Sequence, residues 1–280
     1  MPDGSGDLLT LQEAAEQLKV HYMTAYRWVR QGDLPAFKAG GRLRLRPSDV
    51  ERFLTQRRVD VVLPQHGRTE WPTHVDRLYD LLTDGRAVEA AQLVRKVIAD
   101  GAPAGQVYLD LLTPTLHRIG DGWEAGILSV AAEHRASEIC NVIVARLSDS
   151  FRRRGPARGT AVTFTPPGEQ HAIASAMAAD FMRAGGFDVH HLGVNVPLAD
   201  LRQFLQIVPC NVMCASFTNT GAEAAVYAEI TRLGHDGGDT VVVFGGQGVD
   251  PDAAASSGGA VVESLADLVT CVEDLVQVRA

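Results

Sequence analysis

The 280-residue chain contains no run of about 18 uninterrupted apolar residues, which is the minimum that a membrane-spanning helix requires. Its first residues, MPDGSGDLL, also lack the basic segment followed by an apolar one that marks a secretory signal. We therefore expect a cytoplasmic protein. The hydrophobic share of 46% is typical of a globular chain, and the length allows two or three compact units.

Cysteine is scarce, and its spacing matches neither a zinc site nor a disulfide framework. The four cysteines lie inside apolar runs that are typical of helices or strands: Cys140, Cys210, Cys214 and Cys271. The pattern predicts buried thiols without a chemical role.

Positive charge is scarce over most of the chain. The net charge is -8, but residues 1–60 hold ten Lys or Arg against eight Asp or Glu, so this segment carries +2 and the rest carries -10. Only the N-terminal segment is therefore suited to approach DNA.

The N-terminal segment shows the pattern of a small winged helix-turn-helix. Thr10 and Glu13 form a capping box that opens a helix reaching Leu18. A second helix is predicted over 22–31, followed by a hairpin around Gly40 and Gly41 and a helix over 47–56. We assign residues 1–58 to this domain.

The stretch AAEQLKVHYMTAYRWVRQGDLPAFKAGGRLRLRPSDVERFL resembles the excisionase and MerR-type DNA-binding domains. The resemblance implies that the second helix enters the major groove and that the hairpin is a wing, whose arginines contact phosphates more often than bases. A solvated edge is the simpler interpretation of those arginines, and their alternating spacing disfavours it. The residues implied in DNA binding are Tyr22, Thr24, Arg27 and Arg30 on the helix, and Arg42, Arg44 and Arg46 on the wing.

Residues 59–72 have no sustained hydrophobic period and contain Pro and Gly, which predicts a linker. The next region, 73–154, is predicted to be a four-helix bundle, since each of its segments has helical spacing of apolar residues. The predicted helices cover 73–83, 86–100, 104–119 and 127–152.

Residues 155–280 alternate short apolar strands with helices, which predicts a Rossmann-like, doubly wound parallel sheet. The predicted strands are TAVTF, FDVHHLG, NVMCASF and TVVVFGG, and the predicted helices cover 170–184, 198–207, 221–234 and 262–277. A ligand is expected beyond the carboxyl ends of the strands. The loop after the first strand carries Glu169 and His171 there, and it lacks the G-x-G-x-x-G of a dinucleotide site.

This loop and two later strand ends resemble the cobalamin-binding domain family, whose pattern is D-x-H-x-x-G, then S-x-L or S-x-T, then G-G. The matching residues are Glu169, Gln170, His171, Ala172, Ile173, Ser216, Thr218, Gly245 and Gly246. The resemblance implies that His171 is the lower ligand of cobalt and that Glu169 hydrogen-bonds its other nitrogen. The serine, threonine and glycines would line the pocket of the displaced nucleotide tail. Glu169 and Ala174 depart from the usual Asp and Gly.

The bundle segment GDGWEAGILSVAAEHRAS resembles the cap of the same family, in which the tryptophan and the later E-H pair cover the corrin. Here these residues are Trp123, Glu133 and His134. A core tryptophan and a solvated helix face are the simpler interpretations. The matching spacing directly upstream of the cobalamin pattern favours the cap.

The order of helix-turn-helix, cap and cobalamin domain resembles the CarH-type light-sensing repressors. It implies a light-responsive, non-enzymatic transcriptional regulator that binds operator DNA, forms homo-oligomers and holds adenosylcobalamin or another alkyl or aquo form. Glu124 stands where those repressors can use a histidine for the upper face of cobalt. Two alternatives stay open: a photosensor with a second, bilin chromophore in the cap, and a corrinoid carrier for methyl transfer.

Overall fold

The computed structural model of the chain describes residues 8–18, 20, 22–32, 34–39, 41–56, 70–236 and 238–279. It divides into two compact units, Met1–Gly67 and Arg68–Ala280, and each is described by itself. Most of the predicted linker, 59–72, lies outside the described residues. Among the helices that the structure describes, none is both long and apolar enough to cross a membrane.

The first unit has the predicted winged helix-turn-helix elements: α1 (Leu11–Gln17), α2 (Tyr22–Gln31), β2 (Phe37–Ala39), β3 (Arg42–Leu45) and α3 (Pro47–Gln56). The capping box is present, because the Thr10 hydroxyl accepts from the Glu13 amide at 3.1 Å and the Glu13 carboxylate accepts from the Thr10 amide at 2.7 Å. A two-residue strand that the pattern did not reveal, β1 (Leu9–Thr10), completes an antiparallel sheet in the order β1-β3-β2.

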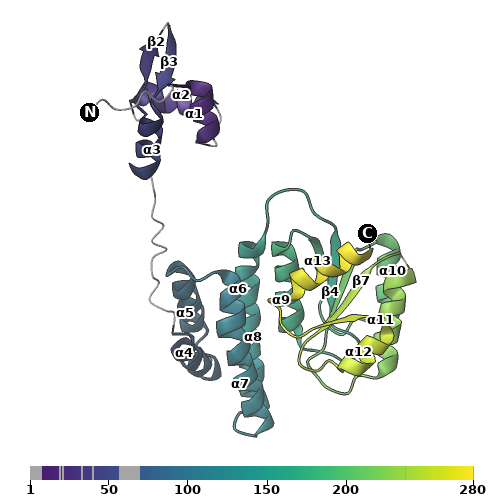
Figure 1. Ribbon diagram of the computed structural model, residues 1–280. Helices are drawn as coiled ribbons and strands as arrows, with labels where there is room; N and C mark the ends of the chain where they lie inside the picture. Colours follow the sequence, from purple (N-terminus) through teal and green to yellow (C-terminus); the bar gives the residue numbers. More distant parts are fainter. Residues whose placement is uncertain are drawn as a thin grey trace. The chain divides into compact units, whose positions relative to one another are not determined.

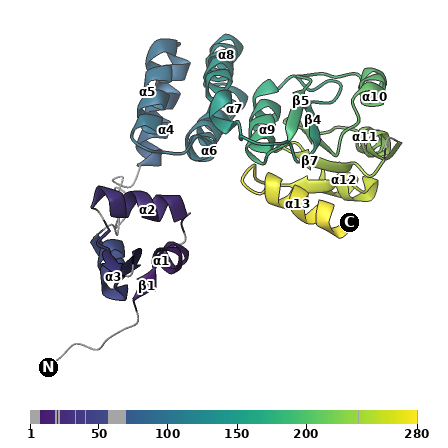
Figure 2. The same ribbon diagram turned by 90° about the horizontal axis from the view of Figure 1, so that it is seen from above.

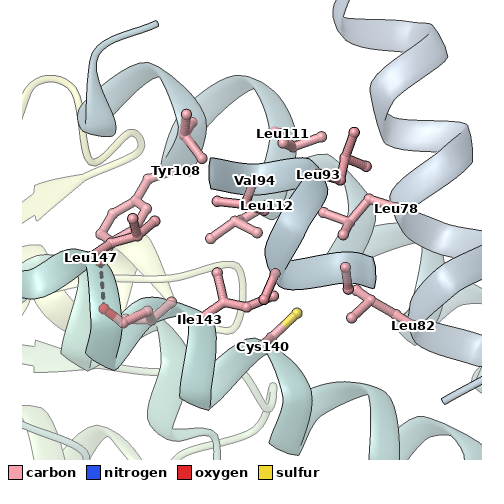
Figure 3. Close-up of a cluster of buried hydrophobic side chains, with 14 of the residues drawn as sticks. Leu78, Leu82, Leu93, Val94, Tyr108, Leu111, Leu112, Cys140, Ile143 and Leu147 are labelled. Carbon is pink, nitrogen blue, oxygen red and sulfur yellow. Dashed lines mark hydrogen bonds between the residues drawn. The ribbon is translucent and has the colours of Figure 1, made fainter. Parts of the chain in front are cut away.

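The second unit begins with the predicted helical bundle (Figures 1 and 2). Its elements are α4 (Trp71–Thr83), α5 (Ala87–Ala99), α6 (Ala104–Gln106), the π-helical turn η1 (Val107–Leu112), α7 (Thr113–Glu124), α8 (Val130–Leu147) and the short helix η2 (Ser148–Phe151). Figure 3 shows leucines and Val94 from α4, α5 and η1 facing Cys140 and Ile143 of α8 across one core. The third helical stretch runs to Glu124, five residues beyond its predicted end.

The sheet of the second unit is parallel and has the order β5-β4-β6-β7-β8, which confirms the doubly wound fold. Its elements are β4 (Thr160–Phe164), α9 (Ala172–Ala184), β5 (Asp188–His191), α10 (Leu198–Ile207), β6 (Val212–Ser216), α11 (Ala224–Asp236), β7 (Val241–Gly245), α12 (Pro251–Ser257), β8 (Ala260–Val262) and α13 (Leu268–Arg279). Alternation along β7 explains the two layers: Val241 and Val243 pack with α9 and α13, while Val242 and Phe244 pack with α10, α11 and α12.

The last predicted helix, 262–277, is wrong in its extent. The Asp250 side chain caps the extra helix α12 by accepting from the amides of Asp252 and Ala253, and Gly258, with a φ of 87°, ends it. The chain then forms β8, in which Val262 pairs with Gly245, before α13 starts. A three-residue strand is too short to show a period of its own.

The bundle is joined to the sheet through α9, which lies between them in both views (Figures 1 and 2). Asp180 on α9 is 1% exposed and accepts hydrogen bonds from Tyr108 of η1 at 2.7 Å and from Ser148 of η2 at 2.6 Å. Arg183, one turn along α9, donates to the same carboxylate at 2.6 Å. Burial and the hydrogen bond to Asp180 both raise the pKa of Tyr108, so its hydroxyl stays a donor. The two parts therefore share a hydrogen-bonded junction.

We expect Asp180→Ala to lower the free energy of unfolding by about 3–5 kcal/mol, because three donors at the junction lose their acceptor. Urea denaturation of the full chain, followed by tryptophan fluorescence, measures the change. Asp236→Ala is the matched control, since Asp236 is half exposed and pairs with Arg232 on the surface of α11. Equal losses in the two variants would contradict the role given to Asp180.

Candidate functional site

The candidate site lies where the strand order of the sheet reverses. From β4 the chain proceeds to β5 on one side, whereas β6 is followed by β7 and β8 on the other. The loops that leave the carboxyl ends of β4 and β6 therefore diverge, and a doubly wound sheet holds its ligand at this place. The loop after β4 contains Glu169 and His171, as the sequence indicated.

Glu169 is the anchor that ties these two loops together. Its side chain is buried, with one oxygen accepting from the amides of Thr218 and Asn219, each at 2.8 Å, and the other accepting from the amide of His171 at 3.0 Å. Burial alone would raise the pKa of Glu169, but the hydrogen bonds from Asn219 and His171 outweigh it and lower the pKa. The group is therefore an anion at neutral pH.

His171 precedes α9 and directs one ring nitrogen at this anion. Its Nδ1 lies 2.5 Å from a Glu169 oxygen. Because an ionised carboxylate only accepts, Nδ1 carries the proton in this contact, and the lone pair of the neutral ring is then on Nε2. The side chain is 48% exposed, and the contact of Nδ1 with Glu169 leaves Nε2 as the nitrogen available to a metal. This donor set fits a cobalt ion that takes one protein nitrogen.

The ends of β6 and β7 bring the other predicted residues to the same edge of the sheet. Ser216, the last residue of β6, is buried, and Gly245 ends β7 beside it. Gly246 has a φ of 101°, and a Cβ there would lie 2.2 Å from the carbonyl oxygen of Phe217. The protein's own backbone therefore explains this glycine without a ligand. Gly248, which sequence analysis missed, is equally tight, at 2.3 Å from the Asn219 carbonyl oxygen.

The remaining residues of the predicted histidine motif differ in their surroundings. Gln170 is exposed, and Ala172 is the half-buried first residue of α9. Ile173 packs against the core of the bundle. Ala174, where the family has glycine, is half-buried inside α9. The motif thus provides the loop between β4 and α9 that carries His171, residues 165–171, which we call the ligand loop. It also provides part of the contact with the bundle.

The bundle residues predicted to cover the corrin lie around the connection from α7 to α8. Trp123 is 50% exposed, so its interpretation as a core anchor is wrong, and Glu124 beside it is exposed. Glu133, in the first turn of α8, accepts from the Ser137 hydroxyl at 2.6 Å and lies 2.5 Å from Nδ1 of His134. Burial raises the pKa of Glu133, but these two hydrogen bonds outweigh it, and His171 in its protonated form would lower it further. The first turn of α8 is therefore within electrostatic reach of the ligand loop.

The first unit presents part of its predicted DNA-binding set. Tyr22 is 40% exposed, and its ring stacks on that of Tyr26 at 6.3 Å. Arg30 is exposed in the last turn of α2. The side chains of Thr24, Arg27 and Arg42 lie outside the described residues.

The two wing arginines whose side chains the structure describes, Arg44 and Arg46, differ in exposure. Arg46 is exposed just after β3, with its guanidinium 4.7 Å from the centre of the Phe37 ring. Arg44 is half-buried, and its charge adds to the hydrogen bonds from Thr10 that lower the pKa of Glu13. Arg46 is therefore the more exposed of the two arginines.

Comparisons with known proteins bear on both units. Residues 8–58 match the family described as a helix-turn-helix domain, and residues 75–148, the bundle, match the family described as a B12 binding domain. The chain is 31% identical over 122 residues to the HTH-type transcriptional repressor CarH of Myxococcus xanthus, a match that spans 43% of this chain and 40% of the repressor. The CarH-type resemblance is confirmed.

A second group of relatives consists of proteins named as corrinoid proteins. Monomethylamine corrinoid protein 1 of Methanosarcina barkeri is 23% identical over 124 residues, covering 43% of this chain and 57% of that protein. A solved structure of the monomethylamine corrinoid protein of the same organism superposes with a TM-score of 0.64 at 19% identity, covering 73% of this chain and 99% of that one, which shows a shared fold. The chain thus spans about half the length, or less, of the curated relatives it matches.

We expect His171→Ala to remove the protein nitrogen from cobalt, because the geometry offers His171 Nε2 as the lower ligand, and to weaken cobalamin retention or leave the cofactor's own base on cobalt. In ¹⁵N-labelled protein loaded with unlabelled Co(II) cobalamin, paramagnetic resonance measures this as loss of the ¹⁵N splitting. His235→Ala, which changes an exposed histidine on α11, is the control and should keep the splitting. Unchanged coordination in His171→Ala would contradict the ligand assignment.

Proposed function

We propose that this chain is a cobalamin-dependent, light-responsive transcriptional regulator that acts without catalysing a reaction. The observation that supports it most is the buried Glu169 anion, which fixes the His171 ring with Nε2 exposed at the switch point of the sheet. This arrangement occurs in one chain with a helix-turn-helix domain and a B12 binding domain. Such a regulator requires one domain that binds the cofactor and another that binds DNA.

In this proposal, His171 would hold the cobalt ion, and Trp123, Glu133 and His134 would cover the corrin ring. The polar and glycine residues at the ends of β6 and β7 line the tail of the cofactor: Ser216, Thr218, Gly245 and Gly246. Bound alkylcobalamin supplies a cobalt–carbon bond that light can break. The protein would orient the cofactor and couple its state to assembly on operator DNA.

A corrinoid carrier for methyl transfer is the second candidate. It is supported by the match to the monomethylamine corrinoid protein and by the shared fold of the bundle and sheet. The helix-turn-helix match over residues 8–58 favours the regulator, because a methyl carrier has no use for a DNA-binding domain.

An absorption spectrum of the full chain loaded with an alkylcobalamin, before and after illumination, together with a DNA-binding assay, separates these candidates. The regulator should show a corrin spectrum that changes irreversibly in light. A further long-wavelength band after exposure to a linear tetrapyrrole would replace this proposal by a two-chromophore photosensor. Because light can break the cobalt–carbon bond of an alkylcobalamin bound to a carrier as well, DNA binding separates the two: no binding to DNA before or after illumination would favour the carrier.

Glu124 is expected to determine the product of illumination. A carboxylate binds Co(III) less durably than imidazole, so the illuminated wild type should carry water, or His134, on the upper face. Glu124→His should shift the spectrum toward coordination by two nitrogens, and Glu124→Gln is the control that removes the charge without adding a ligand. A wild-type product with stable coordination by two histidines, unaffected by His134→Ala, would contradict this expectation.

The wing supplies a prediction for DNA binding. Replacing Arg42, Arg44 and Arg46 by alanine should weaken binding to all DNA sequences. It should also reduce the magnitude of the slope of log K against log salt by up to about 3, because about one counterion fewer is released on binding for each phosphate contact that is lost. Arg46 should contribute to the loss, because its side chain is exposed. Alanine at 152–154, an exposed arginine triplet in the second unit, is the matched control. An unchanged slope in the wing variant would show that the wing does not contact phosphates.

A further inference from the structure

The main chain of the ligand loop is held as firmly as the Glu169 side chain. The carbonyl oxygen of Glu169 accepts from the buried Thr165 hydroxyl at 2.7 Å and from the Asn195 amide at 3.0 Å. That amide also lies 2.9 Å from the Thr165 hydroxyl oxygen. Asn195 belongs to the connection between β5 and α10, so a second connection at the same edge of the sheet reaches the loop.

The side chain of Asn195 makes its own contact with the loop. Its amide oxygen accepts from the amide of Gly168 at 2.8 Å. Gly168 has a φ of 86° and belongs to the tight turn closed by the bond from the Glu169 amide to the Pro166 carbonyl at 3.1 Å. Asn195 thus holds the turn from both its backbone and its side chain, directly before the residue that orients His171.

Asn195 adopts an unusual backbone conformation to do this. With a φ of 53°, it is the one residue other than glycine that has a positive φ in the part of the chain that the structure describes. Asparagine tolerates the left-handed region better than most residues, but glycine would fit there with less strain. Since strained residues cluster where a site needs a fixed geometry, an asparagine in place of glycine at this exposed position points to a use for its side chain.

We propose that Asn195 is a positioning residue that holds the His171 loop in its ligating geometry before cobalamin arrives. Glu169 is then fixed at both ends, its carboxylate by the amides of Thr218 and Asn219 and its carbonyl by Thr165 and Asn195. Binding of cobalt by His171 consequently requires little further ordering of the loop. This inference rests on the proposed role of His171 as the lower ligand.

The test is a double-mutant cycle on the dissociation constant of Co(II) cobalamin in the full chain. Asn195→Gly keeps the left-handed backbone and removes the acceptor for Gly168, so it should weaken binding roughly three- to tenfold, as expected for one lost hydrogen bond. In a His171→Ala background, the same change should have no effect. Asn195→Asp keeps an acceptor oxygen and should restore binding.

A second measurement needs no cofactor. Amide hydrogen exchange at Gly168 should be faster in Asn195→Gly than in the wild type, and slow again in Asn195→Asp. This measurement tests the hydrogen bond from the Gly168 amide to the Asn195 side chain even if a variant binds cobalamin poorly. Equal weakening by Asn195→Gly in both backgrounds, or unchanged Gly168 exchange, would overturn the inference. Absence of the ¹⁵N splitting in labelled wild-type protein would instead overturn the ligand assignment, so the two failures are distinguishable.

Discussion

The buried carboxylate of Asp180 is the constraint on which the second unit depends. A charge that is 1% exposed is stable only if its oxygens are fully used, and here Tyr108, Ser148 and Arg183 use them. Two of these donors come from the bundle, and Asp180 and Arg183 lie on α9, which follows directly after His171. Fixing α9 against the bundle therefore also fixes the ligand loop relative to the first turn of α8, which carries Glu133.

A second buried acid performs the corresponding task across the sheet. Glu169 joins the loop after β4 to the loop after β6, and its two oxygens serve the β6 loop and His171 separately. The resemblance to the cobalamin-binding pattern implied aspartate at this position, and the glutamate found here brings one carboxylate to both partners. The departure from the pattern is thus accommodated by local geometry, and it leaves the anion that keeps His171 in the tautomer suited to metal ligation.

Sequence patterns were sufficient to predict the structure where the interacting residues are close together in the sequence. The capping box of Thr10 and Glu13 spans three residues, and the alternation of strands and helices made the parallel sheet predictable. Contacts created by the fold were not predictable: Thr165 and Asn195 meet only because β4 pairs with β5. In the sequence, Asp180 has the pattern of an ordinary polar residue on an amphipathic helix, and its burial results from the packing of the bundle on α9. The histidine loop was found from its motif, and whether it binds cobalt stays a prediction.

The uneven charge of the chain gives a physical reason for the proposed homo-oligomer. Residues 1–60 carry +2 and the remainder carries -10, so the acidic part is repelled by DNA and attraction is confined to one small domain. Few phosphate contacts from such a domain give weak binding in physiological salt. Joining several copies converts the later contacts into intramolecular ones and raises the overall affinity without new contacts per domain. Control of assembly by the cofactor would therefore control occupancy of DNA, even if the helix-turn-helix itself did not change.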